Sequence, residues 1–225
     1  MSGLLLNRAP MSENPIRVYL ADDHAMVREG LASLLARNPE FEVVGQCGNG
    51  LEVVSGILAC NPDVVVLDIV MPGLNGLDIC REITRKAPAV GILILSVHDN
   101  EQFIVRALEY GAAGYLLKES AADQLAEALR AVARGRRYLG PGIKRDVLDR
   151  AAGTRLDPYD LLSTRERQVL QLIAEGRTSR KIADDLGLSV KTVDTHRMRL
   201  MRKLNIHDLT TLVKFALRKG LVPLD

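Results

Sequence analysis

The amino-acid sequence predicts an α/β fold, a doubly wound sheet of five parallel strands, followed by a small all-α domain. Two observations predict the sheet. Five apolar, β-branched runs alternate with helical patterns over the first 135 residues, and these runs lack polar alternation, as in strands that are covered on both faces. A third observation predicts the second domain, because only helical periodicity follows residue 160.

Each element of the first domain has its own pattern. The expected strands are Ile16–Ala21, Phe41–Gln46, Val64–Leu67, Ile92–Leu95 and Tyr115–Leu117. The expected helices lie near Ala25–Ala36, Leu51–Ala59, Gly76–Arg85, Glu101–Tyr110 and Ala121–Arg134, and Gly135 ends the last of them.

The rest of the chain divides by composition. We expect a disordered tail over residues 1–15, and a linker with room for one short helix over residues 136–160, where glycines and prolines break the pattern. The α/β domain then occupies residues 16–135 and the helical domain residues 161–225. The expected helix caps are Ser163 with Glu166 as a capping box, Thr178 or Ser179, Ser189 after the Gly187 turn, and Asp208, with Gly220 closing the last helix.

Composition excludes several classes of protein. No apolar run approaches the roughly 18 residues that a membrane-spanning helix needs, and Leu4–Leu6 is too short for a signal-peptide core. We therefore expect a soluble, cytoplasmic protein without membrane contact. Three cysteines without paired spacing argue against a disulfide framework, and four scattered histidines argue against a zinc site.

The net charge of +2 is unevenly distributed. The formal charge is −6 over residues 1–135, +2 over residues 136–160 and +6 over residues 161–225. The basic C-terminal domain is the natural candidate for contact with a polyanion.

Polar residues follow four of the predicted strands. Asp22 and Asp23 follow the first strand, Asp68 the third, Ser96 the fourth and Lys118 the fifth. Because functional groups of a parallel sheet gather at the carboxyl ends of its strands, these side chains should converge on one edge. Any one Asp in such a place is usually a helix cap or turn residue, and a lone Lys is usually solvated; the coincidence of five positions favours a site.

The chemistry of such an edge follows from its residue types. Clustered carboxylates repel one another unless a cation lies between them, and oxygen ligands select a hard cation such as Mg²⁺. A carboxylate beside Mg²⁺ and a lysine is a good acceptor for a phosphoryl group. Lys118 and Ser96 are placed to pair with the oxygens of that group.

The segments "VYLADDHAMVREGL", "VVVLDIVMPGLNGLDI", "LILS" and "GAAGYLLKES" resemble the receiver domain of two-component response regulators, which has a flavodoxin-like fold. The resemblance implies that Asp68 accepts a phosphoryl group from a sensor histidine kinase and that Lys118 binds it. It also implies that Asp22, Asp23, Asp68 and the backbone carbonyl of Val70 hold Mg²⁺.

The same resemblance makes Ser96 and Tyr115 a switch pair. If Ser96 is drawn to the phosphoryl group, space opens behind it, and Tyr115 can turn inward to fill that space. The alternative is that Tyr115 is an ordinary half-buried strand residue.

Two other functions compete with a phosphorylation-switched transcription factor. A phosphatase or phosphotransferase that uses Asp68 as a nucleophile generally needs a second carboxylate two residues later, where this chain has Val70. Val70 instead suggests slow hydrolysis of the phosphoryl group, so we expect no enzyme acting on external substrates. A DNA-binding protein that ignores phosphorylation is disfavoured because the set of Asp22, Asp23, Asp68, Ser96 and Lys118 is complete.

The basic domain has a helix-turn-helix pattern, in which the second helix enters the major groove of DNA. The segment "LSTRERQVLQLIAEGRTSRKIADDLGLSVKTVDTHRMRLMRKLNI" is similar to the LuxR-type domain of NarL/FixJ-class response regulators. The expected DNA contacts are Ser189, Lys191, Thr192, Asp194, Thr195, Arg197, Met198, Arg199, Arg202 and Lys203.

Two features of this domain leave alternatives open. Asp194 stands where members of the class often carry a Lys, so it either accepts a hydrogen bond from a cytosine amine or pairs with a neighbouring Arg. The last helix, Thr210 to Lys219, has a partly apolar stripe that serves as a homodimer seam, as core, or as both. The resemblance implies dimers on double-stranded promoter DNA.

Overall fold

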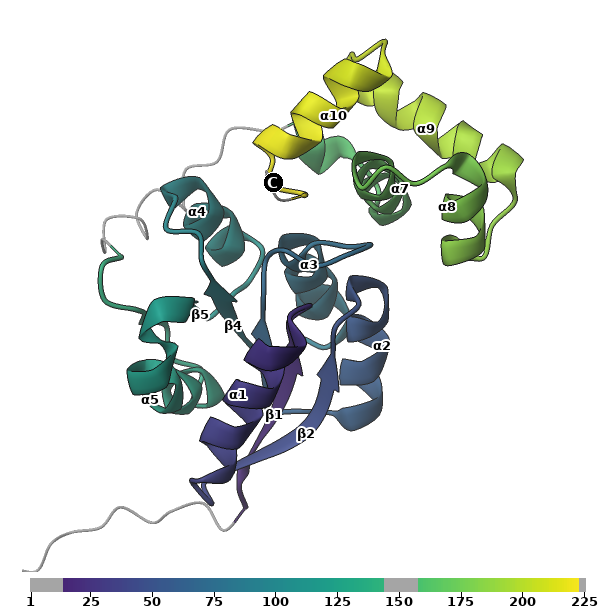
Figure 1. Ribbon diagram of the computed structural model, residues 1–225. Coiled ribbons are helices and arrows are strands. Elements are labelled where there is room, and N and C mark those ends of the chain that lie inside the picture. Colours follow the sequence, from purple (N-terminus) through teal and green to yellow (C-terminus); the bar gives the residue numbers. More distant parts are fainter. Residues whose placement is uncertain (1–13, 144–157, 223–225) are drawn as a thin grey trace, which may run out of the picture.

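The computed structural model describes residues 14–143 and 158–222. The expected tail, for residues 1–13, and the expected linker helix, for residues 144–157, lie outside these ranges. The first domain is a parallel sheet with strand order β2-β1-β3-β4-β5-β6 and helices on both faces, the predicted doubly wound architecture (Figure 1).

The sheet has six strands rather than the predicted five. They are β1 (Ile16–Ala21), β2 (Phe41–Cys47), β3 (Val64–Leu67), β4 (Gly91–Ser96), β5 (Gly114–Leu117) and β6 (Tyr138–Leu139). The additional strand, β6, lies in the expected linker and pairs with β5 in parallel. Its two residues are too few to show a strand pattern in the sequence.

The helices of this domain form two layers. They are α1 (Ala25–Ala36), α2 (Gly50–Cys60), α3 (Gly76–Lys86), α4 (Glu101–Glu109) and α5 (Ala121–Ala133), with a short 3-10 turn, η1 (Lys118–Ser120), before α5. One core cluster joins α2, α3 and α4 to the sheet, and the other joins α1 and α5 to its opposite face. Val65 belongs to the first cluster and Val66 to the second, so β3 is buried on both faces.

The second domain consists of the 3-10 turn η2 (Pro158–Leu161) and the helices α7 (Thr164–Ala174), α8 (Ser179–Leu186), α9 (Val190–Leu204) and α10 (Leu209–Arg218). Their N-terminal caps are Ser163, Thr178, Ser189 and Asp208, and the Ser163–Glu166 capping box is complete. Gly187 takes the left-handed conformation (φ 63°) that ends α8, which turns the chain into α9.

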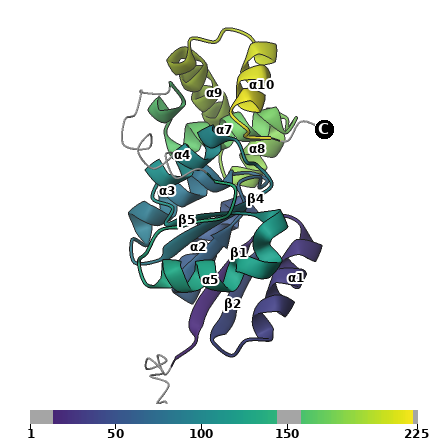
Figure 2. The same ribbon diagram turned by 90° about the vertical axis from the view of Figure 1, so that its left-hand side faces the viewer.

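The helical domain lies over the α3–α4 side of the first domain, with α7 between that domain and α9 (Figures 1 and 2). Two hydrogen bonds join the domains directly. The side-chain amide of Gln171 in α7 donates to the carbonyl of Met71, and the hydroxyl of Thr164 donates to the carboxylate of Glu82. Among the described residues, no helix is long and apolar enough to cross a membrane.

Gly76 lies close to the edge of the sheet where Asp22, Asp68, Ser96 and Lys118 end or follow their strands, which we call the acidic edge. A Cβ atom at this position would lie 1.9 Å from the backbone oxygen of Asp68. We expect Gly76→Ala to lower the free energy of unfolding by about 3 kcal/mol, because the end of β3 must move to make room. Urea unfolding followed by circular dichroism measures this.

The matched control is Gly30→Ala in α1, where the added Cβ meets nothing within 4 Å. This change should be neutral or stabilising by up to about 1 kcal/mol. Equal losses in the two variants would contradict the crowding at Gly76.

Candidate functional site

The residues of the acidic edge come together as the sequence predicts. Asp22 follows β1, Asp68 follows β3, Ser96 ends β4 and Lys118 follows β5. Because these strands are parallel neighbours, their last residues lie at one edge of the sheet.

Lys118 links the two buried carboxylates of this edge. Its Nζ lies 2.6 Å from Oδ2 of Asp22 and 2.7 Å from Oδ2 of Asp68. The second oxygen of Asp68 accepts a hydrogen bond of 2.7 Å from the backbone amide of Ile69. The carboxylate of Asp68 is therefore held in one orientation from both sides.

Burial and charge oppose each other in this pair. Burial raises the pKa of Asp68 above its usual value, and the ammonium group of Lys118 opposes that increase without cancelling it. Burial by itself lowers the pKa of Lys118, but the carboxylates of Asp68 and Asp22 outweigh it, so the net change is upward. Lys118 therefore stays charged.

His24 is a residue of this site that sequence reasoning missed. Its Nδ1 lies 2.7 Å from Oδ1 of Asp23 and 3.4 Å from Oδ1 of Asp22. Ligand atoms of Asp22, Asp23, His24 and Asp68 all lie within 4.8 Å of one another, a spacing that suits a metal ion. The only sequence signal for His24 is its place next to Asp22 and Asp23, in the letters "DDH".

The basic helix α9 presents its predicted polar face to solvent. Lys191, Arg197, Met198, Arg199 and Arg202 are exposed, while Val193 and Leu200 are buried in the domain core. Ile182, Ala183 and Leu186 of α8 fill that core from the other side, as predicted. This is the layout of a helix-turn-helix whose second helix is free to enter a groove.

Some expected DNA contacts have partners inside the domain. Asp194 pairs with Arg197 at 3.3 Å and accepts a hydrogen bond from Ser179, the second of the two alternatives for this residue. Lys203 pairs with the buried Glu166 at 2.7 Å. Ser189 accepts the backbone hydrogen bond of Thr192 as the cap of α9, and Thr195 donates to the carbonyl of Lys191.

Comparison with known proteins identifies both domains. Residues 18–130 match the family described as the response regulator receiver domain, and residues 160–216 match the luxR family of bacterial regulatory proteins. The chain is 36% identical over 229 residues to the transcriptional regulatory protein DegU of Brevibacillus brevis, covering 94% of this chain and 97% of that protein. The chain belongs to the LuxR-type response regulators.

Further relatives agree with this assignment. The transcriptional regulatory protein MctR of Rhizobium johnstonii is 38% identical over 217 residues, covering 94% of this chain and 98% of that one. The crystal structure of the response regulator ChrA, from a haem-sensing two-component system, is 36% identical with a TM-score of 0.51, covering 93% of this chain and 100% of that chain. A structure of RcsB dimers bound to DNA is 26% identical with a TM-score of 0.57, and the match covers 90% of this chain and 98% of that chain.

The expected switch pair of the receiver domain is buried in this structure. Ser96 is fully buried, and its Oγ accepts a hydrogen bond of 3.1 Å from the amide of His98. Tyr115 is fully buried as well, not half-buried, and its hydroxyl donates to the carbonyl of His98 at 2.6 Å. Both side chains therefore hold the β4–α4 loop, and burial raises the pKa of Tyr115.

The last helix is both core and surface. Leu212 and Ala216 of α10 are fully buried, whereas Val213 and Leu217 are half-buried. The stripe therefore contributes to the core along one side and leaves an apolar edge along the other.

Arg202 and Lys203 are adjacent in α9 but differ in their surroundings. Arg202→Ala should weaken binding to random-sequence duplex DNA and reduce the slope of log K against log salt by about one, since one phosphate contact is lost. Fluorescence anisotropy at several salt concentrations measures this.

Lys203→Ala is the matched comparison. It removes the ion pair with Glu166, so we expect a loss of about 1 to 3 kcal/mol in stability. A normal melting temperature for Lys203→Ala, together with an unchanged salt slope for Arg202→Ala, would contradict these assignments.

Proposed function

We propose that phosphoryl transfer from a sensor histidine kinase to Asp68 switches this response regulator between two states of dimerisation and sequence-specific DNA binding, through which it controls transcription. The observation that carries the proposal is the contact of Lys118 with both Asp68 and Asp22 at the carboxyl edge of the sheet. It places a fixed positive charge beside the carboxylate that would receive the group.

The acidic cluster fits Mg²⁺, which here would neutralise charge on the transferred phosphoryl group. Asp22 and Asp68 are buried acceptors, Asp23 is exposed beside them, and the carbonyl of Val70 follows from the family resemblance. The single ammonium of Lys118 balances only one of the two buried carboxylates, which leaves the pocket anionic and favourable to a cation. The protein's own part is to orient Asp68 through Ile69 and Lys118.

The same pocket favours a switch over an enzyme that acts on external substrates. Val70, two residues after Asp68, offers no carboxyl group to protonate a leaving group. On the DNA side, the exposed cationic residues of α9 support binding to the phosphate backbone. The half-buried edge of α10 suits a second copy of the chain.

The phosphoryl acceptor is tested with Asp68→Ala. Incubated with acetyl phosphate and Mg²⁺, the wild-type protein should gain the mass of one phosphoryl group, sediment more as a dimer and bind its chromosomal sites. Asp68→Ala should do none of these. Intact-mass spectrometry, analytical ultracentrifugation and genome-wide mapping of binding sites measure the three effects.

Asp123→Ala, an exposed carboxylate at the start of α5, is the control and should behave as the wild type. Phosphoryl incorporation into Asp68→Ala, or equal occupancy of sites by both proteins, would overturn the proposal.

Val70 is expected to prolong the life of the phosphoryl group. Val70→Asn adds an amide that can position an attacking water, so the phosphorylated protein should hydrolyse at least about tenfold faster. Mass spectrometry after removal of acetyl phosphate gives the rate. Val190→Asn, at a partly exposed position in the other domain, serves as control, and equal rates would refute the role of Val70.

A further inference from the structure

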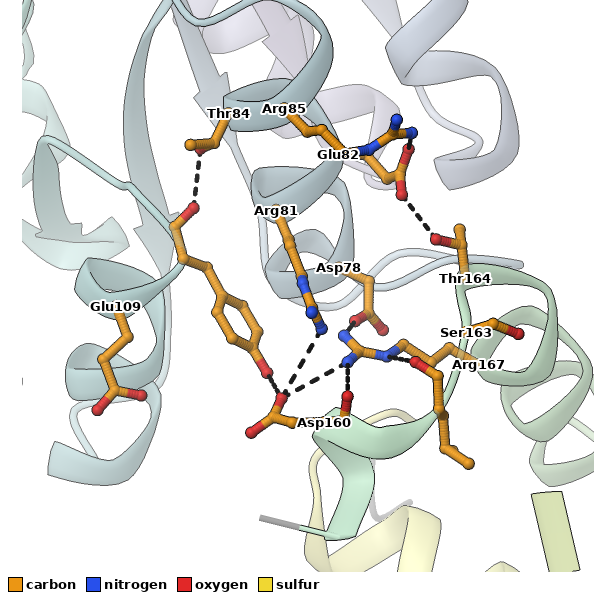
Figure 3. A pocket seen from close by; sticks show the side chains of 12 residues that line it. Asp78, Arg81, Glu82, Thr84, Arg85, Glu109, Asp160, Ser163, Thr164 and Arg167 are labelled. Carbon is orange, nitrogen blue, oxygen red and sulfur yellow. Dashed lines mark hydrogen bonds and ion pairs between the residues drawn. The ribbon is translucent and has the colours of Figure 1, made fainter. Parts of the chain in front are cut away.

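A cleft of about 620 Å³ lies where the two domains meet (Figure 3). One wall is α3, with Arg81 and Arg85, and another is the start of α7, with Ser163 and Thr164. Its volume lies within the range of pockets that bind small molecules. None of the described residues that line it belongs to the acidic edge or to α9, so the proposed function leaves this cleft unused.

Asp160, on the wall of the cleft, has more cationic partners than its charge requires. Its Oδ1 accepts a hydrogen bond from the hydroxyl of Tyr110 and lies 3.5 Å from Arg167, 3.8 Å from Arg106 and 4.0 Å from Arg81. Arg81 is the most distant of the three guanidinium groups, and 48% of its side chain is exposed. The guanidinium group of Arg81 also lies 5.6 Å from the centre of the Tyr110 ring, which holds its charge at the cleft. Asp160 therefore keeps its other partners if Arg81 binds something else.

Glu82, one turn of α3 away, has a surplus of partners as well. Its carboxylate accepts a hydrogen bond of 2.6 Å from Thr164 and lies 2.8 Å from Arg85 and 3.1 Å from Lys86. Burial raises the pKa of Glu82, but these three partners outweigh it and lower the pKa to about 2. The side chain of Arg85 is 65% exposed, and Glu82 would still have Thr164 and Lys86 without it. Arg85 is therefore a second guanidinium group that can turn to a ligand.

The accessible charges of the cleft are cationic. Arg81 and Arg85 are four residues apart on one face of α3, where two like charges repel each other. The other carboxylates of the lining do not balance them. Asp78 is about 2% exposed and pairs with Arg167, and Glu109 of α4 stands apart from both arginines in Figure 3. An anion between the two exposed guanidinium groups would relieve their repulsion.

We propose that this cleft binds a small phosphorylated molecule, with a phosphate group held between Arg81 and Arg85. Guanidinium groups form forked, charge-assisted hydrogen bonds with phosphate oxygens, and two of them can bind one phosphate group from different sides. Neither Asp160 nor Glu82 is left without a partner when the two arginines turn to the ligand. The cleft has room for the rest of a metabolite beside its phosphate group.

A molecule in this cleft would contact both domains, because α3 belongs to one and the start of α7 to the other. Its binding energy would then add to the stability of their present arrangement by mass action. The inference does not depend on Asp68 as the phosphoryl acceptor, since no residue of the acidic edge lines the cleft.

Pyrophosphate in a buffer with EDTA is the probe, because without Mg²⁺ the anionic acidic edge offers it no cation. Isothermal titration calorimetry on the full chain gives the affinity, and nuclear magnetic resonance of the arginine Nε–H groups locates the site. We expect saturable binding that shifts the signals of Arg81 and Arg85 and raises the melting temperature of the protein.

Arg81→Gln and Arg85→Gln should each weaken pyrophosphate binding about tenfold, since each loses one charge-assisted contact. Arg85→Lys keeps the charge without the fork, so its affinity should lie between those of the wild type and Arg85→Gln. The matched control is Arg134→Gln, which removes an exposed arginine at the end of α5, on the opposite face of the sheet from α3. It should bind as the wild type does, and so should Asp68→Ala.

Three results would overturn the site. They are no binding by the wild type at millimolar pyrophosphate, equal affinity of the wild type and Arg85→Gln, and signal shifts confined to the arginines of α9. Loss of binding in Asp68→Ala would assign pyrophosphate to the acidic edge, which refutes the cleft and leaves the proposed function intact. Circular dichroism of each variant confirms that it is folded, and Arg85→Lys decides the outcome if Arg85→Gln is not.

Discussion

The chemistry of the receiver domain depends on one constraint, which is the parallel direction of its strands. Asp68 and Lys118 are 50 residues apart in sequence, yet their charged atoms lie 2.7 Å apart because β3 and β5 both end at the same edge of the sheet. Each strand of this edge contributes a different chemical group: β1 the carboxylates of Asp22 and Asp23, β3 the carboxylate of Asp68, β4 a hydroxyl and β5 a cation. One antiparallel strand would carry its residue to the opposite edge and leave the set incomplete.

A second constraint joins the domains. The side chains of Asp78 and Arg167 are both buried where the two domains meet. Because desolvation offsets much of the attraction between their charges, the pair contributes to the specificity of docking more than to net stability. Tyr159 adds a hydroxyl whose pKa burial raises well above its usual value, which keeps it a donor to Asp78. The interface thus selects one relative position of α3 and α7.

Local patterns in the sequence predicted the elements well. The helix Ala25–Ala36 and the strand Val64–Leu67 have the expected bounds, and Ser163 and Ser189 cap the helices that they were expected to cap. Such features depend on periodicity and on side chains within three or four residues, and both can be read in a single sequence.

Contacts between distant residues were the part that the sequence did not reveal. Asp78 and Arg167 each look like an ordinary charge on a helix, and only the packing of α3 against η2 and α7 makes them a buried pair. Lys203 was expected to contact DNA because it lies on a basic helix, but the structure pairs it with Glu166. The acidic edge was predictable because a topological rule brings strand ends together, whereas no such rule relates α7 to the β3–α3 loop.

The exposed face of α9 has a consequence for how the protein finds its sites. A recognition helix that stays accessible in the docked arrangement leaves Lys191 and Arg202 able to meet the phosphate backbone at any time. Docking of the two domains therefore does not by itself prevent this helix from meeting DNA. Under the proposed function, phosphorylation of Asp68 would then regulate how long a molecule stays at a site more than how often it meets one.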